Sequence, residues 1–132
     1  MHYLLDTNIV GYVIKDLHRV RERLVRIPMS QIAISVVTEA ELLFGVARRP
    51  DAVRLKKLVD EFLVRVHVMP WDSAAARHYA DIRAALERSG DVLGNLDLLI
   101  AAQARAAGST LVSADKTFHR VPGLRIEDWT KR

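Results

Sequence analysis

Short apolar runs alternate with helical segments along this chain of 132 residues. Runs of strand length occupy residues 2–5, 31–35, 66–69 and 109–113, and a possible fifth strand lies at 124–126. Strands that are separated by helices favour a parallel sheet covered on both faces. We therefore expect an α/β fold in which consecutive strands are joined by helical crossovers.

The helical segments carry start and stop signals of their own. Asp72 is a good cap for a long helix, with Gly90 just past its end, and Gly108 closes the next one. Pro50 suits the first turn of an earlier helix. We expect helices after the first strand and at 18–27, 38–48, 50–66, 72–89 and 96–107.

The composition is that of a globular protein with a modest basic excess. Half of the residues are hydrophobic and the net charge is +4, with 15 arginines against 5 lysines. This balance permits nucleic-acid binding, and arginine forks suit phosphate partners. We expect a single domain over 1–132, because the length fits one domain. The lack of cysteine and of a signal or membrane-spanning segment favours a cytoplasmic location.

Four acidic residues fall where the chain switches between strand and helix. Asp6 closes the first apolar run, Glu41 lies in the first turn of the helix after the second, Asp97 opens an apolar helix, and Asp115 follows the fourth run. In an open α/β sheet such junctions gather at the carboxyl ends of the strands. Clustered carboxylates repel unless a cation lies among them, so the pattern predicts a divalent metal site.

Each acid also has a purely structural explanation. Asp6 caps a helix in that reading, Glu41 forms a capping box with Thr38, Asp97 interacts with a helix dipole, and Asp115 starts a turn. The combination favours the metal site, because burying uncompensated carboxylates together costs several kcal/mol. Oxygen-only ligands suit Mg²⁺ or Mn²⁺.

The remaining candidates are weaker. Asp81 lies off the apolar stripe of its helix, and Lys116 and Arg120 follow Asp115 and could touch phosphate. We expect Trp71 and Trp129 to pack at the edges of the domain. The five histidines show no ligand spacing, and the chain has no Gly-rich phosphate loop.

Four motifs, taken together, resemble a known family. LLDTN at 4–8, ISVVTEAELLFGV at 34–46, DLLIAAQARAAGSTLVSAD at 97–115 and VPGLRIEDW at 121–129 look like the PIN-domain ribonucleases. More narrowly, the chain resembles the VapC toxins of bacterial toxin–antitoxin modules. The resemblance runs over essentially the whole chain, in the right order.

This resemblance implies a three-layer α/β/α PIN-like fold with a parallel sheet of four or five strands. It implies Mg²⁺- or Mn²⁺-dependent endonucleolytic cleavage of RNA, with Asp6, Glu41, Asp97 and Asp115 as catalytic residues and metal ligands. The family's glutamate falls on Glu41, because Leu42 and Gly45 hold the register. The fourth acid departs from many relatives, which read threonine-asparagine where this chain has Ser113-Ala114-Asp115.

The implied mechanism is attack on phosphorus by a water that one or two metal ions activate, which leaves a 5′-phosphate. Enteric members imply initiator tRNA, cut in the anticodon stem-loop, as the substrate. The family also implies a VapB antitoxin and a toxin homodimer. Helices 18–27 and 50–66 carry apolar residues that could form a groove for an antitoxin helix: Val20, Leu24, Ile27, Leu55, Leu58, Phe62 and Leu63.

Two other functions compete with a metal-dependent nuclease. A receiver-like phosphoacceptor would need paired acids near the first strand and a phosphorylatable aspartate after a central strand, where only Asp72 is available. A catalytically silent PIN-like module would bind RNA without cutting it, and the retained acids argue against this alternative.

Overall fold

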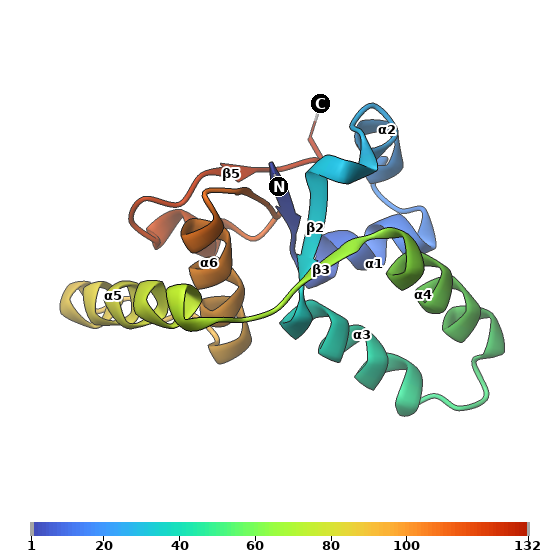
Figure 1. Cartoon of the computed structure of the whole chain (residues 1–132), viewed down its shortest axis with the longest axis horizontal. Helices are drawn as coiled ribbons and strands as arrows, with labels where there is room; N and C mark the ends of the chain where they lie inside the picture. Colours follow the sequence, from blue (N-terminus) through green and yellow to red (C-terminus); the bar gives the residue numbers. More distant parts are fainter. Residues whose placement is uncertain (1, 132) are drawn as a thin grey trace.

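The computed structural model describes residues 2–131 and contains a five-stranded sheet in which all strands are parallel (Figure 1). The strand order is β3-β2-β1-β4-β5, so the first strand is central. The strands are β1 (Tyr3–Leu5), β2 (Ile32–Ser35), β3 (His67–Met69), β4 (Thr110–Val112) and β5 (Ile126–Glu127). The predicted parallel sheet is confirmed, and it has five strands.

Six α-helices and two short 3-10 helices connect the strands in the described part of the chain. The helices are α1 (Thr7–Lys15), α2 (Val20–Leu24), α3 (Val36–Ala47), α4 (Val53–Arg65), α5 (Ser73–Ser89) and α6 (Asn95–Ala107), with 3-10 turns η1 (Met29–Gln31) and η2 (Lys116–Arg120). Within residues 2–131, no helix is both long and apolar enough to cross a membrane.

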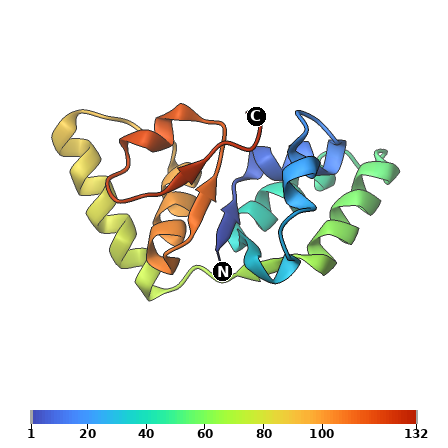
Figure 2. The same cartoon turned by 90° about the horizontal axis from the view of Figure 1, so that it is seen from above.

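The helices cover the two faces of the sheet and create two cores (Figure 2). Leu4 faces α5 and α6, whereas the next residue, Leu5, faces α1 and α4, as the alternation of side chains along a strand requires. Strands buried on both faces explain why the runs are apolar throughout. The expected three-layer α/β/α arrangement is therefore confirmed.

Three helices have ends that differ from those predicted. α3 begins at Val36, because the Ser35 hydroxyl accepts the Val37 N–H at 3.0 Å and caps the helix before Thr38 is reached. α4 begins only at Val53, so Pro50 lies in the preceding turn and not in the first turn. α2 is shorter than 18–27, because the backbone at His18 and Arg19 is left-handed.

The caps of the later helices are as predicted. The Asp72 carboxylate accepts the Ala75 N–H at 3.0 Å, and Gly90 and Gly108 close α5 and α6 with φ of 73° and 66°. One expectation fails, because Trp129 is only 2% exposed and belongs to a core, not to an edge. Its ring lies 5.4 Å from that of Tyr3, which anchors the C-terminal segment on the sheet.

Candidate active site

The four predicted acids lie around the carboxyl ends of the central strands. Asp6 follows β1 and caps α1, and Asp115 follows the adjacent strand β4. Glu41 lies in α3, the helix that leaves β2, and Asp97 lies in the first turn of α6. Parallel strands place these junctions at one edge of the sheet.

Asp6 is the most buried of the four, at 5% exposure. Burial raises the pKa of its carboxyl from 3.8 to about 6, and the nearby charges of Asp97 and Asp115 act in the same direction. Hydrogen bonds from the Ser113 hydroxyl and from the Ile9 N–H, at 2.8 Å, oppose the shift. The carboxylate is thus fixed in place but short of compensating positive charge.

Electrostatic coupling links Asp6 to Asp97 and Asp115, and links Asp97 to Glu41. Partial burial raises the pKa of Asp97, and repulsion from Asp115 and Glu41 raises it further. Two other acids therefore raise the pKa of Asp97, and two raise that of Asp6. Mutual repulsion of this kind would be relieved by a cation bound among the acids.

Two threonines orient Glu41. The Thr7 hydroxyl donates to Glu41 Oε1 at 2.7 Å, and the hydroxyls of Thr7 and Thr38 lie 3.1 Å apart. Because Thr7 has one hydroxyl hydrogen, which Glu41 accepts, Thr38 is the donor to Thr7. The relay fixes one carboxylate oxygen of Glu41 and leaves the other available.

Ser113 connects two of the acids across one turn. Its hydroxyl donates to Asp6, and its oxygen accepts the Asp115 N–H at 3.0 Å. Asp115 Oδ1 in turn accepts the N–H and hydroxyl of Thr117, at 2.9 and 2.7 Å. That Thr7, Thr38, Ser113 and Thr117 position the acids was not predicted from the sequence, which placed Thr38 only in a capping box; the DTN motif and the Ser/Thr ends of the strands are the signals that could have found them.

The donor set fits a hard divalent cation in chemistry, since it consists of carboxylates. Within residues 2–131, no three His, Cys, Asp or Glu side chains stand close enough together to hold an ion as they are found. Repulsion between the carboxylates favours such separated positions, and the attraction of each carboxylate to a divalent cation would outweigh that repulsion. The four residues therefore suit a metal ion in their chemistry and in their position at one edge of the sheet. Their side chains would have to move closer together to enclose the ion.

The structure confirms some of the purely structural explanations of the acids and contradicts one of them. Asp6 does cap α1 and Asp115 does start a turn, so each has a structural contact in addition to its charge coupling. The capping box between Thr38 and Glu41 is wrong, because Ser35 is the cap and Glu41 lies in the second turn. Asp72 is occupied as a helix cap, which leaves a receiver-like protein without its phosphoacceptor.

Among the weaker candidates, Asp81 and Arg120 make ion pairs with residues outside the four acids, and Lys116 follows Asp115 on η2. Asp81 is exposed and pairs with Arg105 at 2.6 Å, and this contact lowers the pKa of its carboxyl. Lys116 and Arg120 lie on η2, and Arg120 faces Asp91 at 3.9 Å. Within residues 2–131, no histidine belongs to a group of three or more side chains that could hold a metal ion.

The predicted groove between the second and fourth helices exists as a hollow of about 360 Å³. Leu24, Leu58 and Phe62 line it, as expected, and α1 and the η1 turn contribute further apolar side chains. Val20 instead belongs to the core, with no exposure, and Ile27, Leu55 and Leu63 pack against that core. Arg21, Glu61 and Arg65 supply the polar lining.

Comparison with known proteins places the chain in a family. The PIN domain family matches residues 3–124. The chain is 38% identical to the tRNA(fMet)-specific endonuclease VapC of Shigella flexneri, over 98% of this chain and 99% of the relative. It superposes on the VapC-containing crystal structure of DNA-bound VapBC from Salmonella typhimurium with a TM-score of 0.90 at 36% identity, covering 98% of each chain.

A second solved complex agrees with this result. The structure of VapBC2 from Rickettsia felis, bound to a promoter DNA fragment, matches with a TM-score of 0.88 and 34% identity over 98% of this chain and 99% of that one. Both the sequence and the fold therefore match along nearly their whole length. The chain belongs to the PIN-domain family and, within it, to the VapC ribonucleases of toxin–antitoxin modules.

Proposed function

We propose that this protein is a Mg²⁺-dependent endoribonuclease whose active site consists of Asp6, Glu41, Asp97 and Asp115. The observation that supports this most directly is the charge coupling of four carboxylates from separate elements at one edge of the sheet. PIN-domain nucleases generally depend on a divalent metal. A purely structural role for each acid would not require charge coupling between acids from separate elements.

The four acids would hold Mg²⁺, with Mn²⁺ as an alternative. When bound, the ion supplies positive charge to the scissile phosphate and lowers the pKa of water. The chain itself fixes the ligands: the Ile9 N–H and Ser113 position Asp6, Thr7 orients Glu41, and Thr117 holds Asp115. Such positioning matters because loosely held groups lose much of their catalytic effect.

We further propose that the substrate is a tRNA, with the initiator tRNA anticodon stem-loop as the first to test. The relative from Shigella flexneri is named for action on tRNA(fMet). Sequencing of RNA 5′ ends after a short pulse of expression would identify the cleaved bond. Cuts distributed over many messenger RNAs, without enrichment in a tRNA, would contradict this substrate.

The central experiment compares single variants of the four acids. Asp6→Asn, Glu41→Gln and Asp97→Asn should each lower the cleavage rate by at least about 100-fold, because each removes ligand charge and keeps shape. Glu39→Gln is the matched control, since Glu39 also lies on α3 and is half-buried. Full activity of purified Asp97→Asn would exclude Asp97 from the mechanism.

Metal binding has a readout that is independent of cleavage. Mg²⁺ or Mn²⁺ should raise the melting temperature of the wild type, because a ligand that binds only the folded state stabilises it. The increase should shrink in Asp6→Asn. Equal increases in both proteins would place the metal elsewhere in the molecule.

The apolar groove between α2 and α4 is proposed as the site for a VapB-type antitoxin. The solved relatives from Salmonella typhimurium and Rickettsia felis are toxin–antitoxin complexes. An amphipathic helix could place its apolar face against Leu24, Leu58 and Phe62, while an antitoxin arginine reaches the acids. Co-purification with the protein encoded beside this one tests the proposal, and a neighbour that neither binds nor suppresses toxicity would argue against it.

A homodimer is proposed through α3. This helix is rich in apolar residues, yet Thr38 is its one fully buried residue, and Leu43 and Phe44 are 46% and 63% exposed. Such an apolar face on a surface helix is typical of a protein contact. A second copy of the chain would cover it.

A further inference from the structure

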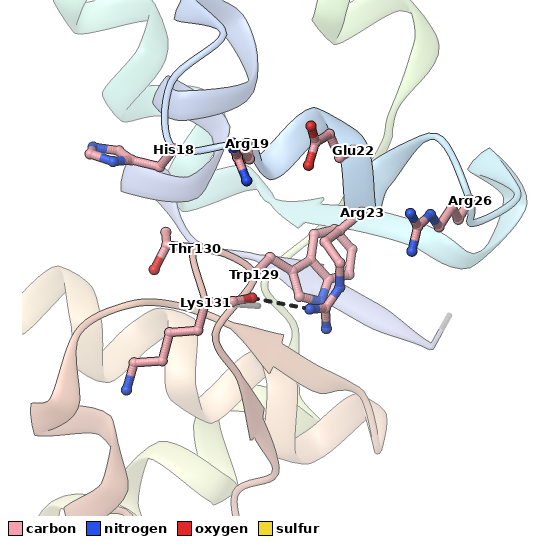
Figure 3. A pocket seen from close by; sticks show the side chains of 8 residues that line it. All are labelled: His18, Arg19, Glu22, Arg23, Arg26, Trp129, Thr130 and Lys131. Atoms are coloured by element: carbon pink, nitrogen blue, oxygen red, sulfur yellow. Dashed lines mark hydrogen bonds between the residues drawn. The ribbon is translucent and has the colours of Figure 1, made fainter.

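A basic hollow of about 650 Å³ lies between α2 and the C-terminal segment, and we call it the α2 pocket (Figure 3). The four acids of the proposed active site are not among the residues that line it. Arg19, Arg23 and Arg26 come from α2 and its flanks, whereas Lys131 comes from the opposite, C-terminal side. The described lining residues are His18, Arg19, Glu22, Arg23, Arg26, Trp129, Thr130 and Lys131.

The charges of this pocket are unbalanced. Four cationic side chains surround it and Glu22 is the single acid among its described lining residues. Arg23 is tied into the fold, because it donates to the Lys131 carbonyl at 3.3 Å and faces Glu127 at 3.8 Å. Arg19 and Arg26 are exposed and have no carboxylate within 4.0 Å among residues 2–131, so their guanidinium groups are available to a ligand.

The backbone that presents Arg19 is in a conformation that side chains disfavour. Asp16, His18 and Arg19 have φ of 54°, 56° and 60°, although glycine would adopt this region freely. A non-glycine residue is strained in this region. Arg19 caps α2 without any side-chain hydrogen bond to the helix, so its side chain does not offset that strain within the fold.

Helix α1 connects the pocket to the proposed active site. Asp6 caps the N-terminus of α1, and His18, just beyond the other end, packs on Tyr12 of the same helix with ring centroids 4.5 Å apart. The helix has nine residues and is therefore roughly 14 Å long. A nucleic-acid backbone advances about 3.4 Å per nucleotide in a duplex strand, so the separation corresponds to only a few nucleotides.

We infer that the α2 pocket binds a backbone phosphate of the RNA substrate, a few nucleotides from the bond that is cut. This inference rests on the proposed ribonuclease function. Arginine forks bind phosphate oxygens in pairs, and an RNA is a regularly spaced array of such anions. Because phosphate contacts position a nucleic acid and do not read its bases, the pocket governs affinity and not sequence choice.

The test uses the double variant Arg19→Gly/Arg26→Ala and leaves Arg23 in place. The matched control is Arg54→Ala/Arg77→Ala, which removes two exposed arginines outside the pocket. Fluorescence anisotropy with a labelled anticodon stem-loop RNA, in EDTA to prevent cleavage, gives the affinity between about 50 and 200 mM salt. The melting temperature should not fall through Arg19→Gly, since glycine relaxes the left-handed backbone.

We expect the pocket variant to bind RNA about tenfold more weakly. The slope of log affinity against log salt concentration should become shallower by about one to two. With metal, its KM should rise while kcat at saturating RNA stays within about twofold of wild type. The control should bind within about twofold of wild type.

Three results would overturn the inference. The pocket variant could bind RNA as tightly as the wild type, or the control variant could lose as much RNA affinity as the pocket variant. The pocket variant could also keep its RNA affinity but fail to bind the antitoxin encoded beside this protein. The last result would make the pocket a protein-binding site. A wild type that binds the RNA through this pocket but cuts no RNA would instead refute only the proposed nuclease function.

Discussion

Asp6 is both a helix cap and one of the coupled acids. It caps α1 through the Ile9 N–H, and it lies at the centre of the acidic edge with a pKa of about 6. The cap requires only an acceptor oxygen, which asparagine also supplies. The fold therefore needs the acceptor oxygen of Asp6 but not its negative charge, whereas a metal site would need the charge.

The stability of the metal-free protein should reveal this conflict through pH. The pKa of Asp6 is raised on folding, so its neutral form favours the folded state, and this contribution is complete below about pH 4 and lost as pH rises through about 6. Asp6→Asn keeps the neutral form at every pH. In EDTA, the gain in free energy of unfolding of Asp6→Asn over wild type should grow by up to about 3 kcal/mol between pH 4 and pH 7.5.

Urea denaturation at several pH values measures this difference. Comparison with the wild type at each pH cancels the titrating groups that are not coupled to Asp6, such as Asp81 and Asp128, whose lowered pKa values act in the opposite sense. A pH-independent difference would mean that Asp6 carries no unfavourable charge in the folded protein.

At the scale of elements, Asp6 and Ser35 cap α1 and α3, whereas α6, which carries Asp97, begins after Gly94 without a side-chain cap. Asp72 caps α5 and is not among the acids that raise the pKa of Asp6 or Asp97. The α3 cap also has a consequence for the site. It sets the helical register that brings Glu41 to the Thr7 hydroxyl.

Asp72 provides the contrast between an acid that serves an element and one that serves the site. Asp72→Ala should lower the free energy of unfolding by about 1 kcal/mol, because the Ala75 N–H loses its acceptor. RNA cleavage at a temperature well below unfolding should be unchanged. Asp72→Asn, which keeps an acceptor, is the control and should restore most of the stability; a loss of cleavage in either variant would assign Asp72 to the site.

For the whole molecule, the two cores account for the apolar runs but not for the outer face of α3. Phe44 is 63% exposed and the Arg48 guanidinium lies 5.4 Å from its ring centre, so the aromatic side chain is covered by one arginine and not by the core. A stable dimer buries a total of at least about 1,000 Å². In the proposed homodimer, such a face on each of two copies would supply the apolar centre of the interface.

Phe44→Glu should convert a dimer of the antitoxin-free protein into a monomer at micromolar concentration, as measured by size-exclusion chromatography with light scattering. A charge at the interface centre would be buried without a partner. Val64→Glu is the control, since Val64 is 85% exposed on α4 and its replacement should leave the dimer intact. A dimeric Phe44→Glu would move the interface away from α3.

The sequence by itself determined the alternation of strands and helices, and with it the edge at which the acids would meet. A strand of three apolar residues followed by Asp6 is a local pattern, and so are the caps at Asp72, Gly90 and Gly108. These features depend on neighbours a few residues away, and such information is complete in one stretch of chain. The family motifs added the order of the acids.

Only the tertiary structure decided which side chains hold those acids and which apolar residues remain exposed. The contact of Thr7 with Glu41 spans 34 positions, and the Ser113 contact with Asp6 joins β4 to β1. The same holds for Trp129, which is buried because the C-terminal segment returns to Tyr3, at the other end of the chain. Spacing within the sequence cannot specify such contacts, because strand order and packing bring distant residues together.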